Sequence, residues 1–348
     1  MTTTESTTAQ QRSAQQRSAQ QHRAVLGRPS EELPAERRPH PGPIAVLPRP
    51  KDVFVDAVIA GGGEVGELSS QTRGVVWLSS QRASELSELL EQNPQVEWVQ
   101  LPWSGIDAFA PVLKPFAGTA RPLWTSAKGA YSQPVAEHAL TLTLALLRVI
   151  PTRVRARSWS RVAEGVSLFG LNVVIIGAGG IAVELIRLLA PFGTHITVVR
   201  RSAEELAGAE RTLTVDRLDE VLPEADVVVV AAASTSETRH LIGAAQLESM
   251  KPTAVLVNIA RGALIDTDAL VAGLATGTIA GAGLDVTDPE PLPDGHPLWD
   301  EPRVIITPHS ADTPYMTAPL LAERIRTNVR AMLGDGRFEG VVDPAKGY

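Results

Sequence analysis

A glycine-rich turn between an apolar strand and a helix constrains the fold of this chain most. The run Val173–Ile176 is continuously apolar, which is typical of a strand buried on both faces of a parallel sheet. The turn follows it, and the apolar spacing of Ile181–Leu189 then predicts a helix. A second apolar run, Ile196–Val199, completes a strand–helix–strand unit. Such a unit requires a parallel sheet with helices packed against it.

The turn has the Gly-x-Gly-x-x-Ala spacing of a dinucleotide phosphate cradle. Gly177 permits the tight turn, Gly179 lets a pyrophosphate approach the backbone, and Ala182 leaves room for the helix to pack on the strand. The helix N-terminus offers free N–H groups and the positive end of its dipole to an anion. A generic glycine-rich turn is the alternative, but the position between strand and helix favours a dinucleotide. We expect the cofactor to contact Gly177, Ala178, Gly179, Gly180 and Ile181.

The end of the second strand bears on which dinucleotide binds. An acidic residue at this position binds the ribose 2′-hydroxyl of NAD. This chain instead has Arg200, Arg201 and Ser202, with no acid before Glu204. Two guanidinium groups and a hydroxyl suit a 2′-phosphate, so NADP is favoured over NAD. Two solvated surface arginines are the alternative interpretation.

Short apolar strands alternate with helical segments along most of the chain, which predicts an α/β fold. We expect two Rossmann-like domains, with a parallel-sheet dinucleotide-binding domain over residues 125–310 inserted into a smaller flavodoxin-like substrate domain. The latter comprises residues 41–124 and 311–348. The strands expected are 44–47, 75–78, 96–101, 173–176, 196–199, 227–230, 254–258, 283–286 and 304–307, and the helices are 84–90, 135–157, 181–189, 218–222, 268–274 and 313–333.

Composition limits the other classes of function. The net charge of −7 argues against nucleic acid or an anionic membrane as the main partner. There is no cysteine, so disulfides and cysteine-based zinc sites are excluded, and no metal is expected. No apolar run reaches the roughly 18 residues of a membrane span, and we expect a cytoplasmic protein. Residues 1–40, which carry a repeated Ala-Gln-Gln motif, are expected to be a disordered tail, with an organelle-targeting peptide as the alternative.

Three polar residues, Arg261, Glu290 and His309, each follow an apolar strand. Open α/β sheets place their chemistry at such strand ends. Arg261 can hold a carboxylate and polarise a neighbouring keto oxygen. His309, as imidazolium, can supply a proton, and Glu290 would favour the charged imidazole and fix its orientation. A turn arginine, a solvated glutamate and a loop-capping histidine are the structural alternatives. Together the three side chains indicate reduction of a 2-keto acid.

Several ordered motifs cover nearly everything after residue 41. They are VAEHA at 135–139, GAGGI at 177–181, MKPTAVLVNIARG at 250–262, LDV at 284–286, Glu290-Pro291 and TPH at 307–309. With these motifs the chain resembles the D-isomer-specific 2-hydroxyacid dehydrogenase family, and most closely its glyoxylate/hydroxypyruvate reductase-like members. The resemblance implies an NAD(P)-dependent oxidoreductase that transfers a hydride between the cofactor and a small 2-keto or 2-hydroxy acid. It also implies that Arg261, Glu290 and His309 are the catalytic residues.

The resemblance implies further site residues. Asp285 is expected to bind the nicotinamide carboxamide, and Arg261 and His309 are expected to contact the cofactor as well. Ile259, Ala260, Ala232, Ala233 and Thr238 are expected to line the cofactor site. The loop before Asp107 resembles the family's substrate loop, so the backbone N–H groups of Ser104, Gly105 and Ile106 are expected to bind the substrate carboxylate. Trp103 is expected to form a wall of the substrate pocket, with a core position as the alternative.

The chain departs from the family pattern at a few positions. Gly180 stands where a larger residue is common, Asp312 where glycine is common, and Thr287-Asp288 where Phe-Glu is usual. None of these changes removes a catalytic group, but they leave the shape of the pocket open. His138, on the long apolar helix, is expected to be a buried histidine with its hydrogen bonds satisfied rather than a chemical group.

The apolar helix at 135–157 predicts a homodimer, because burying it within one small domain is difficult.

The alternatives to a 2-keto acid reductase are a dinucleotide-sensing regulator on the same fold, as in related transcriptional corepressors, and a dehydrogenase of another small anion such as formate or phosphite. Turnover of a 2-keto acid panel with NADPH or NADH discriminates among them.

Overall fold

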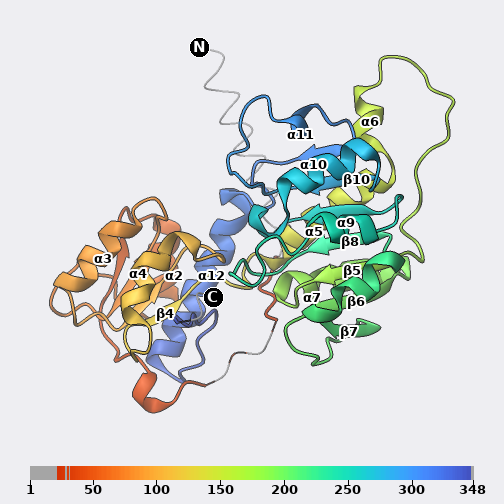
Figure 1. The fold of residues 1–348 in the computed structure, drawn as a ribbon. Helices are drawn as coiled ribbons and strands as arrows, with labels where there is room; N and C mark the ends of the chain where they lie inside the picture. Colours follow the sequence, from red (N-terminus) through yellow and green to blue (C-terminus); the bar gives the residue numbers. More distant parts are fainter. Residues whose placement is uncertain (1–21, 28–29, 31, 346–348) are drawn as a thin grey trace, which may run out of the picture.

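Two parallel β-sheets organise the computed structural model, which describes residues 22–27, 30 and 32–345 (Figure 1). The smaller sheet is fully parallel, with its strands in chain order. Single-residue bridges extend both of its edges: Val65 lies parallel beside Ile44, and Val341 antiparallel beside Thr125. Its strands are β1 (Ile44–Leu47), β2 (Gly74–Trp77), β3 (Trp98–Gln100) and β4 (Leu123–Thr125).

The larger sheet has seven parallel strands in the order β11-β10-β9-β8-β5-β6-β7. The direction of winding reverses between β5 and β8, so a crevice is expected outside the carboxyl ends of these two strands. The strands are β5 (Asn172–Ile176), β6 (His195–Arg200), β7 (Arg211–Thr214), β8 (Val227–Val230), β9 (Val255–Asn258), β10 (Gly281–Leu284) and β11 (Val304–Ile306).

Helices cover both faces of the larger sheet, which explains why its central strands are apolar throughout. All four residues of β8 are valines and all are buried. Separate apolar cores fill the two faces of this sheet. No helix in the described part of the chain is long and apolar enough to cross a membrane. The shorter helices are α2 (Asp52–Ala60), α3 (Ala83–Gln92), α4 (Ala110–Leu113), α7 (Gly180–Leu189), α8 (Leu218–Val221), α9 (Ala244–Ser249), α10 (Thr267–Thr276) and α11 (Pro297–Asp300).

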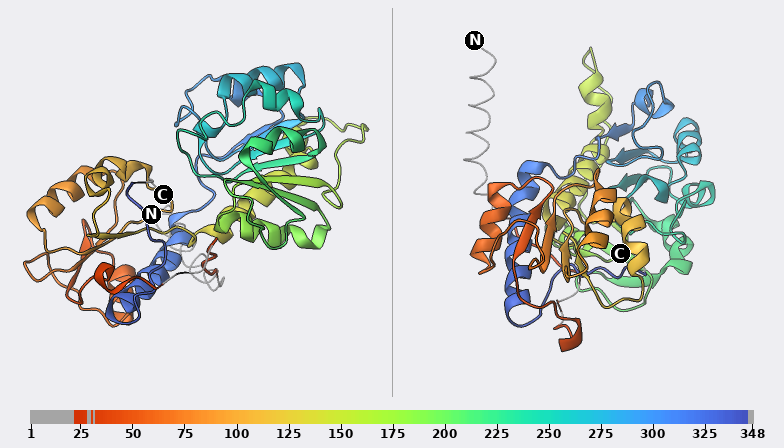
Figure 2. Two further views of the ribbon diagram at one scale, coloured as in Figure 1. Left: turned by 60° about the horizontal axis from the view of Figure 1, so that its bottom comes forward. Right: turned by 90° about the vertical axis from the view of Figure 1, so that its left-hand side faces the viewer.

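Two longer helices join the two lobes that contain these sheets (Figures 1 and 2). Helix α5 (Ser132–Leu147) packs on α7 and on the strands of the larger sheet. Helix α12 (Pro314–Leu333) follows the last strand of the larger sheet yet packs on α2 beside the smaller one. The predicted fold class, an α/β protein with two Rossmann-like units, is confirmed. The domain limits 41–124, 125–310 and 311–348 remain a proposal, which the return of α12 to the first sheet supports.

The prediction of one helix over residues 135–157 is wrong. Helix α5 ends at Leu147, Val149 has a left-handed backbone with φ 56°, and a separate helix α6 (Ile150–Arg155) follows. Pro151 explains the break, because a proline cannot continue an α-helix but is tolerated in the first turn of a new one. The edge strand β7 and the helix α2 were not predicted from the sequence.

The prediction of a disordered tail over residues 1–40 is wrong for the part that the structure describes. The side chain of Leu33 is buried, and its backbone N–H donates to the carbonyl oxygen of Gly336. The backbone N–H of Val25 donates to the carbonyl oxygen of Gly129 at 2.9 Å. These segments therefore pack on the folded body, whereas residues 1–21, 28–29 and 31 lie outside the described residues.

Candidate active site

The ends of β10 and β11 bring Glu290 and His309 together. Nδ1 of His309 lies 2.7 Å from Oε1 of Glu290, and both side chains are about half exposed. With Nδ1–H donating to the carboxylate, the ring is held in one orientation and Nε2 is the nitrogen left for a substrate. His309 has φ 50°, a backbone conformation that is uncommon outside glycine.

Asp285 holds the loop that carries His309. Its Oδ1 accepts from the hydroxyl of Thr307 at 2.6 Å and from the N–H of Ser310 at 2.9 Å, while its Oδ2 accepts from the N–H of Ala311 at 3.1 Å. Only 2% of Asp285 is exposed. A carboxylate has about four acceptor sites, so three donors leave little room for another. The expected contact with a nicotinamide carboxamide stays a prediction, and the structure adds a role in loop positioning.

Arg261 faces the smaller lobe. Its Nε and Nη2 donate to Oδ2 of Asp107 at 2.9 and 2.8 Å, and its Nη1 donates to the carbonyl oxygen of Ala260. A Cβ placed on Gly105 would lie 1.5 Å from Nη2 of Arg261, so only glycine allows this approach. The guanidinium is therefore positioned to bind a carboxylate beside the 104–106 loop. In this structure it binds the carboxylate of Asp107, a residue that was not predicted from the sequence to be part of the site.

The other expected substrate residues surround the same loop. Trp103 is 38% exposed and meets the ring of Tyr131 edge-on, so it is not a core residue, and its place in the wall of a substrate pocket stays a prediction. The hydroxyl of Ser104 donates to the carbonyl oxygen of Ala127, which fixes the loop. Ile106 is buried. Among residues 22–27, 30 and 32–345, no carbonyl or side chain accepts from the backbone N–H groups of 104–106, so these donors have no protein partner there.

Asn258 shapes the turn that carries Arg261. It is fully buried at the end of β9, where its Oδ1 accepts from the N–H of Ala260 at 3.0 Å and its Nδ2 donates to the carbonyl oxygen of Arg261 at 2.9 Å. Gly262 packs so closely on the next segment that a Cβ would lie 1.9 Å from the carbonyl oxygen of Thr287. Ile259 and Ala260 are both buried within this turn.

Asp312 adds a carboxyl group that the family pattern lacks. Burial raises the pKa of Asp312, and the nearby carboxylate of Asp285 raises it further. The charges of His309 and Arg261 act in the opposite direction and lower it, with His309 the stronger of the two. Asp312 therefore lies within the electrostatic reach of His309 and Arg261.

The glycine turn fits a dinucleotide. Gly177 has φ 118°, and a Cβ on it would lie 2.4 Å from the carbonyl oxygen of Ala231, so the β5–α7 turn crosses the end of β8 with no space for a side chain. A Cβ on Gly179 would meet nothing within 4 Å, so the backbone is open on the side where a side chain would lie. Helix α7 begins at Gly180, and the N–H groups of its first turn have no partner within the helix.

The residues expected at the adenosine end have mixed surroundings. Arg200 ends β6 and donates to the carbonyl oxygen of Glu204 at 3.1 Å and to its Oε2 at 3.3 Å. Its guanidinium is thus paired with the acid that follows it, while Arg201 and Ser202 are exposed. Thr238 donates to the carbonyl oxygen of Ala233 at 2.8 Å, which closes the loop after β8 that also contains Ala232.

The segment before residue 28 lies against the glycine turn. The hydroxyl of Ser132, at the start of α5, donates to the carbonyl oxygen of Val25 at 3.0 Å. A Cβ on Gly180 would lie 1.9 Å from that same oxygen, and a Cβ on Gly27 would lie 3.1 Å from Cα of Gly179. The departure from the family pattern at Gly180 therefore has a physical cause, because a side chain there would collide with Val25.

Replacing Gly180 by alanine should release this segment. The added Cβ and the carbonyl oxygen of Val25 cannot remain 1.9 Å apart, and the backbone of residues 23–27 must move. We expect faster tryptic cleavage after Arg23, followed by mass spectrometry. Gly273→Ala is the control, because its Cβ would meet only ordinary contacts at 3.7–4.0 Å. Equal cleavage rates in the two variants would show that the contact does not hold the segment.

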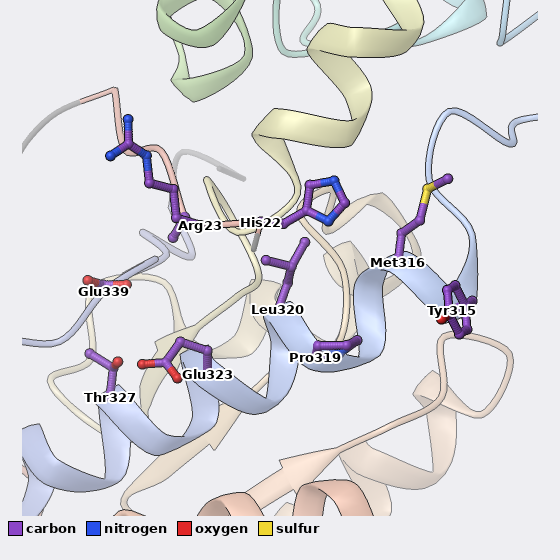
Figure 3. A pocket seen from close by; sticks show the side chains of 10 residues that line it. His22, Arg23, Tyr315, Met316, Pro319, Leu320, Glu323, Thr327 and Glu339 are labelled. Atoms are coloured by element: carbon purple, nitrogen blue, oxygen red, sulfur yellow. The ribbon is translucent and has the colours of Figure 1, made fainter. Parts of the chain in front are cut away.

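A pocket lies between residues 22–24 and one side of α12. Figure 3 shows His22 and Arg23 on one side and Tyr315, Leu320 and Glu323 along the helix on the other. It contains none of the side chains expected to take part in catalysis. Within the described residues, no group of three or more histidine, aspartate or glutamate side chains is placed to hold a metal ion.

Comparisons with known proteins agree with this geometry. The model of the D-isomer specific 2-hydroxyacid dehydrogenase NAD-binding domain matches residues 140–311. An uncharacterized protein in the proB 3′ region of Corynebacterium melassecola is 38% identical over 297 residues, which are 84% of this chain and 95% of that protein. Glyoxylate/hydroxypyruvate reductase B of Pectobacterium carotovorum is 36% identical over 222 residues, covering 61% of this chain and 69% of the reductase.

A solved structure extends the similarity to both lobes. The D-isomer specific 2-hydroxyacid dehydrogenase of Xanthobacter autotrophicus, crystallised with NADPH and MES, superposes with a TM-score of 0.73 at 27% identity. The match covers 88% of this chain and all of that one. The motifs, the two sheets and these relatives lead to the same assignment: the chain belongs to the D-isomer-specific 2-hydroxyacid dehydrogenase family.

Proposed function

We propose that this protein is an NAD(P)H-dependent reductase of small 2-keto acids, with glyoxylate and hydroxypyruvate as the best candidates. One observation carries the proposal. The His309–Glu290 pair, with Nδ1 to Oε1 at 2.7 Å, follows the carboxyl ends of β10 and β11, and Arg261 follows the neighbouring strand β9. The glycine turn follows β5 in the same parallel sheet. A proton donor, a carboxylate clamp and a dinucleotide cradle thus share one edge. The Pectobacterium reductase, similar over most of its length, supports the substrate class.

Substrate binding is assigned to the two lobes together. The backbone N–H groups of residues 104–106 have no acceptor within the described residues, and the guanidinium of Arg261 reaches over Gly105 to the carboxylate of Asp107, so we assign both to the substrate carboxylate. A substrate carboxylate would displace Asp107 from the guanidinium. The remaining donors of Arg261 would then polarise the keto oxygen, where negative charge grows during reduction.

The chemical step needs one hydride and one proton. When bound, a nicotinamide cofactor would supply the hydride that reduces C2 of the keto acid. His309 donates the proton of Nε2 to the keto oxygen, which becomes the hydroxyl of the product. Glu290 remains hydrogen-bonded to Nδ1 and stabilises the imidazolium before transfer. Solvent can restore the proton afterwards, because the side chain of His309 is 48% exposed.

A substrate panel run with both nicotinamide cofactors tests the function. We expect oxidation of NADPH with glyoxylate and hydroxypyruvate, and a D-configured hydroxy acid wherever the product is chiral. Absence of turnover with every 2-keto acid, together with tight dinucleotide binding, would favour a regulatory protein on this fold. Turnover of formate or phosphite alone would reassign the substrate.

The cofactor preference is a separate proposal. We infer that NADP is favoured, because Arg201 and Ser202 are exposed beyond β6 and no acid precedes Glu204. Loss of a charge-assisted hydrogen bond costs roughly 1.5–3 kcal/mol, so Arg201→Ser should lower kcat/KM for NADPH by about tenfold or more while sparing NADH. Arg217→Ser, which removes a surface guanidinium paired with Glu220, serves as control. Equal losses with both cofactors would contradict a 2′-phosphate contact.

We also propose a homodimer, as the sequence indicated, but through the C-terminal part of the apolar segment 135–157 and the loop that follows it. Helix α5 is already covered by α7 and by the larger sheet. The exposed apolar side chains belong instead to α6 and the long loop after it, which projects from the body (Figure 1): Val154 is 74% and Trp159 92% exposed. Light scattering should give a dimer mass for the wild type and a smaller mass for Trp159→Asp. A monomeric wild type would refute the proposal.

A further inference from the structure

A chain of partly buried hydrogen bonds links helix α5 to the loop that carries His309. Nε2 of His138, on α5, lies 2.9 Å from the hydroxyl oxygen of Thr307. That hydroxyl donates its single hydrogen to Oδ1 of Asp285 at 2.6 Å. Thr307 can then only accept from His138, so Nε2 of His138 carries a proton and donates it.

Asp285 extends this chain of hydrogen bonds to the backbone around His309. Its carbonyl oxygen accepts from the N–H of His309 itself at 2.8 Å. Its carboxylate accepts from the N–H groups of Ser310 and Ala311, the next two residues. The carboxylate is almost fully buried, so each of these bonds is expensive to break. Movement of Thr307 or Asp285 would therefore move the backbone that carries the imidazole.

The backbone of His309 needs such support. Its φ of 50° lies in the left-handed region, which is unfavourable for a side chain of this kind and persists only where the surroundings enforce it. The bond of Nδ1 to Glu290 fixes the ring but lies on the half-exposed side of the loop. The hydrogen bonds that run from His138 through Thr307 to Asp285 restrain the same loop from the side of α5.

We propose that His138 is a positioning residue for the reduction: it donates to Thr307 and, through Thr307 and Asp285, holds His309 where Nε2 meets the keto oxygen. The proposal rests on the function proposed above and extends it to a residue on a different element, which contacts neither substrate nor cofactor. The side chain of His138 is 20% exposed, and its Nε2 lies 3.6 Å from Oδ1 of Asp285, beyond hydrogen-bond distance, so the hydroxyl of Thr307 makes the hydrogen-bonded link between them.

Paired substitutions separate positioning from packing. His138→Gln keeps an N–H donor at about the place of Nε2, and His138→Leu removes it at similar volume. Thr307→Ser keeps the hydroxyl, and Thr307→Val removes it. We expect the Leu and Val variants to lose about tenfold or more in kcat, with KM for the keto acid nearly unchanged, because a small displacement of a catalytic group lowers the rate strongly. The Gln and Ser variants should keep most of the wild-type kcat.

A second measurement does not depend on turnover. In protein with 15N-labelled histidine, the ring signals of His309, identified by their loss in His309→Gln, should shift or broaden in His138→Leu and match wild type in His138→Gln. Wild-type kcat in His138→Leu, or equal losses in His138→Leu and His138→Gln at unchanged melting temperature, would overturn the proposal. A wild-type protein without turnover overturns the proposed function alone, because the spectra still test the positioning.

Discussion

Replacing His309 by glutamine will lower kcat for 2-keto acid reduction by about 10³-fold, because an amide N–H is far too weakly acidic to transfer its proton to the keto oxygen. Glu290 then loses its contact with Nδ1, but its side chain is 42% exposed and can be hydrated, so the loop should keep its conformation. Substrate binding is assigned to Arg261. KM should therefore change far less than kcat, and steady-state kinetics at saturating cofactor will measure both.

Two further variants show whether the loss belongs to the proton donor. His195→Gln removes another exposed histidine that is paired with a glutamate, on β6, and should keep the wild-type kcat. Glu290→Gln leaves the imidazole in place but removes the charge that stabilises its protonated form, so its loss should be smaller than that of the His309 variant. If His309→Gln retains most of the wild-type kcat, another group supplies the proton.

Much of the fold could be predicted because parallel strands buried on both faces have a distinctive composition. Strand β8 consists of four valines, and β5 consists of an asparagine followed by four apolar residues. The edge strand β7 escaped prediction because three of its four residues, Arg211–Thr214, are polar and only Leu213 is buried. The break at Val149 escaped because valine is disfavoured in the left-handed conformation it adopts, although Pro151 was a visible signal.

The candidate site was predictable where it depends on neighbouring strands. Glu290 and His309 follow β10 and β11, which pair in parallel, so their side chains were expected at one edge. The contact of Asp107 with Arg261 spans 154 residues and depends on how the two lobes face each other, which no local pattern encodes. In the same way, the unusual Gly180 was visible in the sequence, but its cause, the oxygen of Val25, was not.

Replacing Arg261 by alanine will lower kcat/KM for the keto acid by about 10²–10³-fold, since a donor aimed at the developing charge of the transition state is lost. The guanidinium reaches over Gly105, and in the structure it already binds the carboxylate of Asp107 through two nitrogens. Its loss should not unfold the protein, because the side chain of Asp107 is 59% exposed and can be hydrated. Binding of NADPH, followed by fluorescence, should change much less than kcat/KM.

Charge and geometry at this position can be separated. Arg261→Lys keeps the cation but loses the planar fork that matches a carboxylate, so its kcat/KM should lie between wild type and the alanine variant. Arg82→Ala, which removes an arginine paired with Glu85 on α3, should be neutral. Because Gly105 has no side chain to fill the space left in Arg261→Ala, added guanidinium ion should restore part of the activity. Undiminished kcat/KM in that variant, with no response to guanidinium, would mean that the substrate carboxylate binds elsewhere and that the arrangement of Arg261 opposite the 104–106 loop serves only to hold the two lobes together.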